Sequence, residues 1–232
     1  FLIFYKKIEE PQRLSKAMGF ISGLKLIWTH DPDARSLFLA FLSNSLANAL
    51  PATLFLFFVS YILKTPEQTG AFLILYFISG LCALPLWLHL AKRWGKKKTW
   101  IVSMVLASLA FSFVPFLGSG DGFYFFIITL LSGLSLGADM ALPAAIQADI
   151  AQKFDKNGQS LTGVLFGFWA MLTKFSLALA VGISFGILGL GGFEPERPTV
   201  ASLTILSMLY GLAPVLFKGL AIAFIYKFTD EI

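Results

Sequence analysis

Long apolar stretches alternate with short charged segments along the whole chain. Six of the stretches approach or exceed the roughly 20 residues that a helix needs to cross a bilayer. They run over residues 36–63, 70–90, 99–117, 123–148, 160–190 and 200–226. Because lipid offers no hydrogen-bond partner to backbone N–H and C=O groups, we expect each stretch to cross as a helix. The pattern predicts an all-α membrane protein with six transmembrane helices.

The composition agrees with a membrane protein. The chain is 57% hydrophobic and only 13% charged, whereas soluble domains average about 25% charged residues. In a soluble domain the net charge of +5 would suggest a nucleic-acid partner, but the placement of the charge explains it better. We therefore predict the lipid bilayer, and no nucleic acid, as a partner. Cys82 is the single cysteine, so we expect no internal disulfide.

Lysine and arginine residues gather in every second connection between the spans. The segments before span one, between spans two and three, between four and five, and after six hold 14 of these residues. The other connections hold only Lys64 and Arg197. Basic residues flanking membrane helices stay on the cytoplasmic side. The asymmetry predicts a multi-pass protein of the cytoplasmic membrane with both ends of this chain in the cytoplasm.

Residues 1–35 are predicted to be the end of a preceding helix followed by a cytoplasmic loop. The chain opens with five apolar residues and two lysines, without an initiator methionine, so we expect further membrane helices before it. Residues 6–35 mix apolar and charged positions at roughly helical spacing. This spacing fits either a helix on the membrane surface or a solvated linker. Residues 29–33 carry the signal of a helix start.

Asp139 and Lys174 lie inside predicted spans, at estimated depths of roughly 15 and 21 Å from the cytoplasmic side. An ionisable group at such depth costs at least about 2.5–3.5 kcal/mol, so each is expected to face protein or a water-filled cavity. Each is a candidate contact for substrate or coupling ion, or a member of a structural ion pair, and the two depths permit them to pair. Lys218 lies nearer the end of span six, where its ammonium group can extend to the membrane surface.

Asn44, Asn48 and Pro51 follow one another at helical spacing and share one face of span one. The two asparagines are candidates for binding sugar hydroxyl groups, or for hydrogen bonds between helices. Trp169 in span five is a candidate for stacking on a sugar ring, or a packing residue. We expect residues 186–192, which are rich in glycine, to be too flexible for a simple helix end.

The sequence contains neither a motif typical of a nucleophilic enzyme nor a phosphate-binding loop, and its His, Cys, Asp and Glu residues lack metal-ligand spacing. We therefore predict no enzymatic activity, no metal and no cofactor other than a coupling ion, Na⁺ or H⁺.

Several segments resemble a known family of transporters. The sequence KRWGKK at residues 92–97 resembles the R-x-G-[RK]-[RK] loop motif of the major facilitator superfamily. Residues 148–150, read as ADI and followed by Gly163 and Lys174, resemble the signature of the glycoside–pentoside–hexuronide:cation symporters, which include melibiose permease. Residues 189–195 and 210–228 look like that family's loop after helix eleven and its twelfth helix.

The resemblance implies a twelve-helix transporter of which this chain is the second half, helices seven to twelve, after the central loop. Lys174 matches the family's helix-eleven lysine, which lies near the sugar and cation sites. Asp149 matches the first acid of the signature, whereas the second acid, the tyrosine and the acid before Gly163 have no counterpart here. Lys92 replaces the acid of the loop motif, so the ion pair attributed to that motif is not expected in the same form.

The sequence thus predicts a secondary active transporter that moves a sugar or a related solute by alternating access, coupled to Na⁺ or H⁺. Its partner is the N-terminal six-helix half of the same protein. Its candidate substrate- or ion-binding residues are Lys174, Asp139, Asn44, Asn48, Trp169 and Asp149. One alternative is a lysolipid or amphiphile transporter of the same fold, and another is an uncoupled facilitator. A membrane-embedded enzyme or scaffold is less favoured, because the spans hold few acidic or histidine residues.

Overall fold

A computed structural model describes residues 19–156 and 161–228, and these residues form seven α-helices and three short turns of other helix types. The α-helices are α1 (Phe20–His30), α2 (Pro32–Phe57), α3 (Thr69–Trp94), α4 (Lys96–Ser112), α5 (Gly122–Lys156), α6 (Thr162–Leu190) and α7 (Val200–Tyr226). The short turns are η1 (Phe58–Leu63), which is π-helical, and the 3-10 turns η2 (Pro66–Gln68) and η3 (Val114–Phe116). The preceding helix end predicted for residues 1–5 lies outside the described residues.

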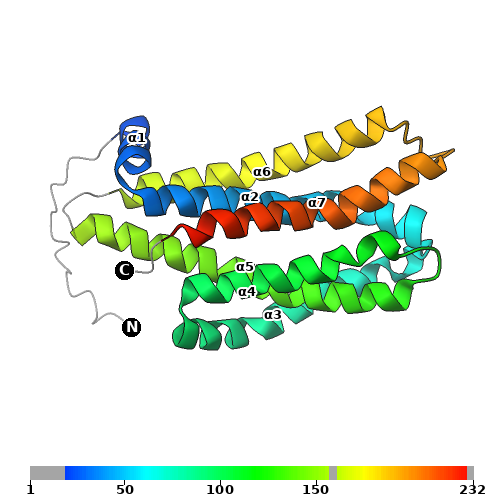
Figure 1. The fold of residues 1–232 in the computed structure, drawn as a ribbon, viewed down its shortest axis with the longest axis horizontal. Coiled ribbons are helices and arrows are strands. Elements are labelled where there is room, and N and C mark those ends of the chain that lie inside the picture. The colour runs from blue at the N-terminus through cyan, green and yellow to red at the C-terminus, as the bar shows by residue number, and fades with distance from the viewer. Residues whose placement is uncertain (1–18, 157–160, 229–232) are drawn as a thin grey trace, which may run out of the picture.

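Among the described residues, six segments are long and apolar enough to cross a membrane, which confirms the six predicted spans. They contain α2 to α7 in chain order. The first continues through η1, the second begins with η2, and the third continues through η3. In Figure 1 the long helices run along a common direction and α1 lies across one end of them. We call this end the basic end, because the α3–α4 turn with its five lysine and arginine residues also lies there.

The helices form two groups that meet through α4 and α7. In one group α2 packs against α6 and α7, and in the other α5 packs against α3 and α4. Contacts between α4 and α7 join the two groups, whereas α6 has few contacts outside its long interface with α2. The middle of the bundle therefore lies between α2, α4, α5 and α7.

Local signals in the sequence define several helix ends. The predicted start signal at residues 29–33 is confirmed: the Asp31 side chain accepts a hydrogen bond from the backbone N–H of Ala34 at 2.8 Å, and Pro32 opens α2. Gly95 alone separates α3 from α4, with a φ of 86° that favours glycine. The α3–α4 hairpin therefore turns within one residue.

The expectation that residues 186–192 are not a simple helix end is wrong. The helix α6 continues through Leu190, and within residues 186–192 only Gly192 has a positive φ, of 67°. Ala180, Ser184 and Leu188 form a buried stripe along the end of α6. This packing outweighs the cost of about 1 kcal/mol for each glycine in a helix.

The helix α5 also differs from the prediction, because it continues to Lys156 rather than ending near residue 148. Lengthening a helix at its charged end satisfies further backbone groups without placing charge in lipid.

Two large apolar clusters fill most of the bundle, one toward each end, and a small third cluster joins α2 to α6. The cluster near the basic end includes Ile27, Trp87, Trp100, Met104, Leu142 and Phe168. The second, which we call the distal core, includes Leu54, Phe58, Phe72, Phe125, Val114 and Tyr210. Buried polar residues, among them Asn44, Ser103, Ser135 and Lys218, occupy the intervening positions on four helices. The bundle therefore has a polar layer near its middle.

Small residues allow α3 and α5 to approach closely. A Cβ atom on Gly137 would lie 2.5 Å from the backbone oxygen of Gly80, and one on Gly133 would lie 2.6 Å from the backbone oxygen of Tyr76. Real Cβ atoms do not approach backbone oxygens so closely, and small residues are the usual means of close packing between membrane helices. The position of α5, and of everything it carries, depends on these glycines.

Replacing Gly137 by alanine is expected to destabilise the protein by about 1–3 kcal/mol, because the added methyl group must separate two backbones. Gly219→Ala is the matched control, since a Cβ atom there meets nothing within 4 Å. Thermal unfolding of the full-length protein in detergent compares the two variants. Equal stability of both would show that the α3–α5 contact is not as close as the structure has it.

Candidate functional site

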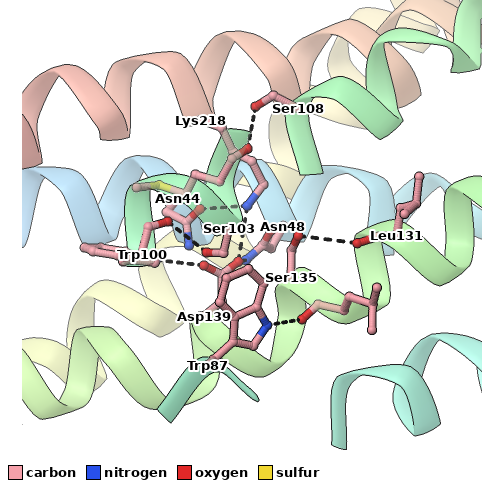
Figure 2. A network of polar contacts seen from close by, with 12 residues as sticks. Asn44, Asn48, Trp87, Trp100, Ser103, Ser108, Leu131, Ser135, Asp139 and Lys218 are labelled. Atoms are coloured by element: carbon pink, nitrogen blue, oxygen red, sulfur yellow. Dashed lines mark hydrogen bonds and ion pairs between the residues drawn. The ribbon is translucent and has the colours of Figure 1, made fainter. Parts of the chain in front are cut away.

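The carboxylate of Asp139 is the centre of the polar layer. Asp139 lies at the middle of α5, and its side chain is 7% exposed. Its Oδ1 accepts a hydrogen bond from the indole N–H of Trp100 on α4 at 2.8 Å. Its Oδ2 accepts one from the amide of Asn48 on α2, also at 2.8 Å. Figure 2 shows these side chains converging on the carboxylate from different helices.

Lys218 of α7 completes this arrangement. Its ammonium group lies 3.2 Å from Oδ2 of Asp139 and donates a hydrogen bond to the side-chain oxygen of Asn44 at 2.8 Å. The Lys218 side chain is only 1% exposed. Two opposite charges are thus buried together and hydrogen-bonded, which is the condition under which a protein interior tolerates them.

This network joins four helices through one carboxylate. Asn44 and Asn48 come from α2, Trp100 from α4, Asp139 from α5 and Lys218 from α7. Asp139 and Lys218 cancel in charge, and both carboxylate oxygens already accept hydrogen bonds. A cation could therefore reach Asp139 only by displacing the Lys218 ammonium group or one of the neutral donors. Its chemistry in this state is structural: it binds the two groups of helices together.

A cavity of about 150 Å³ adjoins the network on the side of the distal core. Asn48 is part of its wall, and the other walls are mainly aromatic and aliphatic. The lining residues include Phe55, Phe72, Phe77, Phe111, Phe125 and Tyr210, with Thr129 and Ser132 as further polar members. Asn48 therefore belongs to the cavity and to the network at once.

The structure brings together three of the residues predicted to form a site, Asn44, Asn48 and Asp139. The estimated depths permitted a pairing of Asp139 with Lys174, but Asp139 pairs with Lys218 instead. The interpretation of Lys218 as extending to the membrane surface is also wrong, since its side chain is almost fully buried. Depth along a helix was the only available signal, and it does not indicate which helices are neighbours.

Trp169 and Lys174 of α6 lie apart from this network. The ring of Trp169 stacks on Phe41 of α2, with centroids 3.5 Å apart and planes inclined by 22°. It therefore serves the α2–α6 contact in this structure, and it is not among the residues that line the cavity. Lys174 is exposed, and no described residue pairs with its ammonium group.

Asp149 lies near the basic end of α5 and forms an ion pair with Lys96 at 2.5 Å. Both side chains are more than a third exposed, so the pair is accessible to solvent. Lys97, the next residue, donates a hydrogen bond to the backbone oxygen of Phe228 and lies 5.6 Å from the ring centre of Tyr226. The loop motif, which lacks the family's acid, is thus attached to α5 and α7 through its lysines.

No group of three or more His, Cys, Asp or Glu side chains suited to a metal ion occurs within residues 19–156 and 161–228. The network and the cavity remain the polar and apolar parts of the candidate site.

Comparison with known proteins supports the predicted family. The family described as MFS/sugar transport protein matches residues 3–229, which is nearly the whole chain. The chain belongs to this family. The resemblance to the major facilitator superfamily is confirmed, and the six spans fit one half of a transporter of this fold.

Several relatives of this transporter family are similar over most of the chain. The sodium-dependent lysophosphatidylcholine symporter 1-A of Danio rerio is 27% identical, covering 97% of this chain and 43% of that protein. The sphingosine-1-phosphate transporter MFSD2B of Mus musculus is 26% identical, covering 89% and 43%. The inner membrane symporter YicJ of Escherichia coli (strain K12) is 29% identical, covering 92% and 47%. The chain spans less than half the length of these relatives.

Replacing Asp139 by asparagine is expected to destabilise the protein by about 3–5 kcal/mol, because the buried Lys218 ammonium group loses its counter-charge. Lys218→Met is expected to be destabilising for the converse reason. The double variant Asp139→Asn/Lys218→Met removes both charges and is expected to be more stable than either single variant. Thermal unfolding of the full-length protein in detergent, analysed as a double-mutant cycle, measures this coupling. Additive effects would mean that the two charges do not stabilise each other.

Proposed function

We propose that the protein containing this chain carries a single-chain amphiphile, such as a lysophospholipid, across the membrane by alternating access. The cavity beside Asn48 is the observation that carries this proposal. In the transport cycle this six-helix half moves relative to another half, and the substrate binds near the bilayer midplane between them. The cavity lies within this half, where it is suited to part of a hydrocarbon chain.

The size and walls of the cavity support an apolar occupant. A cavity of about 150 Å³ lined by aliphatic and aromatic side chains is large enough for a benzene-sized group. Here the walls are of that kind over most of their extent, and polar groups such as Asn48, Thr129 and Ser132 are the minority. A sugar would leave most of its hydroxyl groups without partners against such walls, which is costly.

Lys174 supports an anionic headgroup as the other part of the substrate. Its ammonium group lies on the exposed face of α6 without a partner in the described part of the chain. A lysine within a membrane span requires an oppositely charged or hydrogen-bonding partner. A phosphate group on the substrate would supply one. Two of the relatives named above are transporters of phosphate-bearing lipids by their names, which is consistent with this assignment.

Sugar transport is the second candidate, because the family description includes it. The asparagines that were predicted to bind sugar hydroxyl groups are already engaged, Asn44 with Lys218 and Asn48 with Asp139. A sugar at that position would have to break the polar network. This makes the sugar proposal weaker than the amphiphile proposal. Coupling to Na⁺ is part of our proposal, and H⁺ is the alternative ion.

Uptake into proteoliposomes tests the proposal with the full-length protein. Radiolabelled lysophosphatidylcholine and a radiolabelled glycoside are compared, each with and without imposed Na⁺ and H⁺ gradients. We expect accumulation of lysophosphatidylcholine driven by the Na⁺ gradient, and no accumulation of the glycoside. Accumulation of the glycoside alone would replace the proposal by sugar transport.

The same assay tests the cavity with two alanine-to-phenylalanine variants. Ala52 lines the cavity, so Ala52→Phe is expected to fill part of it and to lower lysophosphatidylcholine uptake. Losing about two buried methylene groups of the chain would weaken binding by about 10-fold. Ala223→Phe is the control, because Ala223 is exposed on α7 and is not a lining residue. Equal uptake by both variants would mean that the chain is not bound in this cavity.

Lys174→Gln is expected to reduce coupled uptake by about 10-fold or more, because a hydrogen bond to a charged group contributes about 1.5–3 kcal/mol. Lys174→Arg keeps the charge and is expected to retain part of the activity. Both variants should reach the membrane, since the side chain has no described partner whose loss would destabilise the fold. Normal uptake by Lys174→Gln would exclude the proposed role.

A further inference from the structure

The turn between α3 and α4 carries more positive charge than its described neighbours pair with. Five of the seven residues from 92 to 98 are lysine or arginine. Lys96 pairs with Asp149, and Lys97 contacts Phe228 and Tyr226. The remaining three, Lys92, Arg93 and Lys98, are exposed and have no partner within the described ranges.

An exposed apolar stripe on α4 begins one helical turn after Lys98, which is one of these cations. Val102, Val105 and Leu109 follow Lys98 at intervals of four, seven and eleven residues, and therefore share its face of the helix. Each of the three apolar side chains is 42–58% exposed. This face of α4 thus carries a cation at the basic end and exposed apolar side chains from there toward the distal core.

The same order occurs on α3. Leu88, Leu81 and Ile74 precede Lys92 by four, eleven and eighteen residues, which again places them on one helix face. These side chains are 47–62% exposed. Trp94 stands between the two stripes at the turn and is 50% exposed, as is typical of an aromatic residue at the level of lipid headgroups. Both helices pack on α5, so their stripes lie on the other side of the hairpin.

We propose that the α3–α4 turn binds an acidic phospholipid of the surrounding bilayer. Lys92, Arg93 and Lys98 contact the phosphate-bearing headgroup, and the acyl chains lie along the stripes on α3 and α4. A phospholipid has the same order of charge and hydrocarbon as this surface. A soluble anion would explain the three cations but leave the apolar stripes without a role, and a nucleic acid would meet the hydrocarbon layer next to the turn.

This site is separate from the proposed transport site. The cavity beside Asn48 has its own lining residues, and neither the three cations nor the residues of the two stripes are among them. The lipid would be a bound partner that is not transported. Its binding is measured without transport, so failure of the lipid proposal and failure of the transport proposal give different results.

The test uses the full-length protein purified in detergent and compares two charge-matched triple variants. Lys92→Gln/Arg93→Gln/Lys98→Gln removes the proposed headgroup contacts. Lys25→Gln/Arg35→Gln/Lys227→Gln removes three exposed cations from the same end and is the control. Native mass spectrometry counts retained phosphatidylglycerol. Thermal unfolding is measured with added phosphatidylglycerol, with phosphatidylcholine, and with soluble glycerol phosphate.

We expect phosphatidylglycerol to be retained by the wild-type and control proteins and to raise their unfolding temperature more than phosphatidylcholine does. In the Lys92/Arg93/Lys98 variant the affinity is expected to fall by about 100-fold, which corresponds to about 1 kcal/mol for each of the three basic residues near the membrane surface. Equal retention by both triple variants would overturn the site. Protection by glycerol phosphate equal to that by the lipid would overturn the assignment to a phospholipid.

Discussion

The ion pair between Asp139 and Lys218 is the interaction on which the arrangement of the bundle depends. Each charge alone would be costly to bury at the middle of a membrane span, and each is tolerated because the other is 3.2 Å away. The pair requires α5 and α7 to keep a fixed relative position. Asn44, Asn48 and Trp100 extend this requirement to α2 and α4. Close packing of α3 on α5 through Gly80 and Gly137 then places the remaining helix of that group.

The two large apolar clusters differ in whether a cavity adjoins their side chains. Near the basic end, large side chains such as Trp100 and Phe38 are fully or almost fully buried. The distal core has a cavity among its aromatic rings, and the amide of Asn48 forms part of the cavity wall. An occupant of the cavity would therefore lie next to the residue that connects α2 to Asp139. The side chain of Asn48 therefore links an occupant of the cavity to the relative position of the helices.

The sequence predicted the six spans well because lipid imposes one simple condition, a long apolar helix, on each of them. It also singled out Asp139 and the Asn44/Asn48 face, since polar groups within spans are few. It failed on partners: Lys174 was a plausible counter-charge by depth, but the position of a side chain around the helix axis and the order of helices in the bundle decide contact. Lys218 was missed for the same reason. The glycine-rich end of α6 was misjudged because the packing of Leu188 is not visible in local composition.

Because α5 is longer than a bilayer is thick, the ion pairs along it lie in two different environments. Its 35 residues extend over roughly 52 Å, whereas the hydrocarbon core of a bilayer is about 30 Å thick. The partly exposed pairs that Asp149 and Lys153 of α5 form with Lys96 and Asp31 therefore lie toward its end, within reach of dissolved salt. Mobile ions screen such pairs at physiological ionic strength but do not enter the apolar interior around Asp139. A rise in salt concentration would thus weaken the ion pairs of the basic end, while the centre of the bundle keeps its geometry.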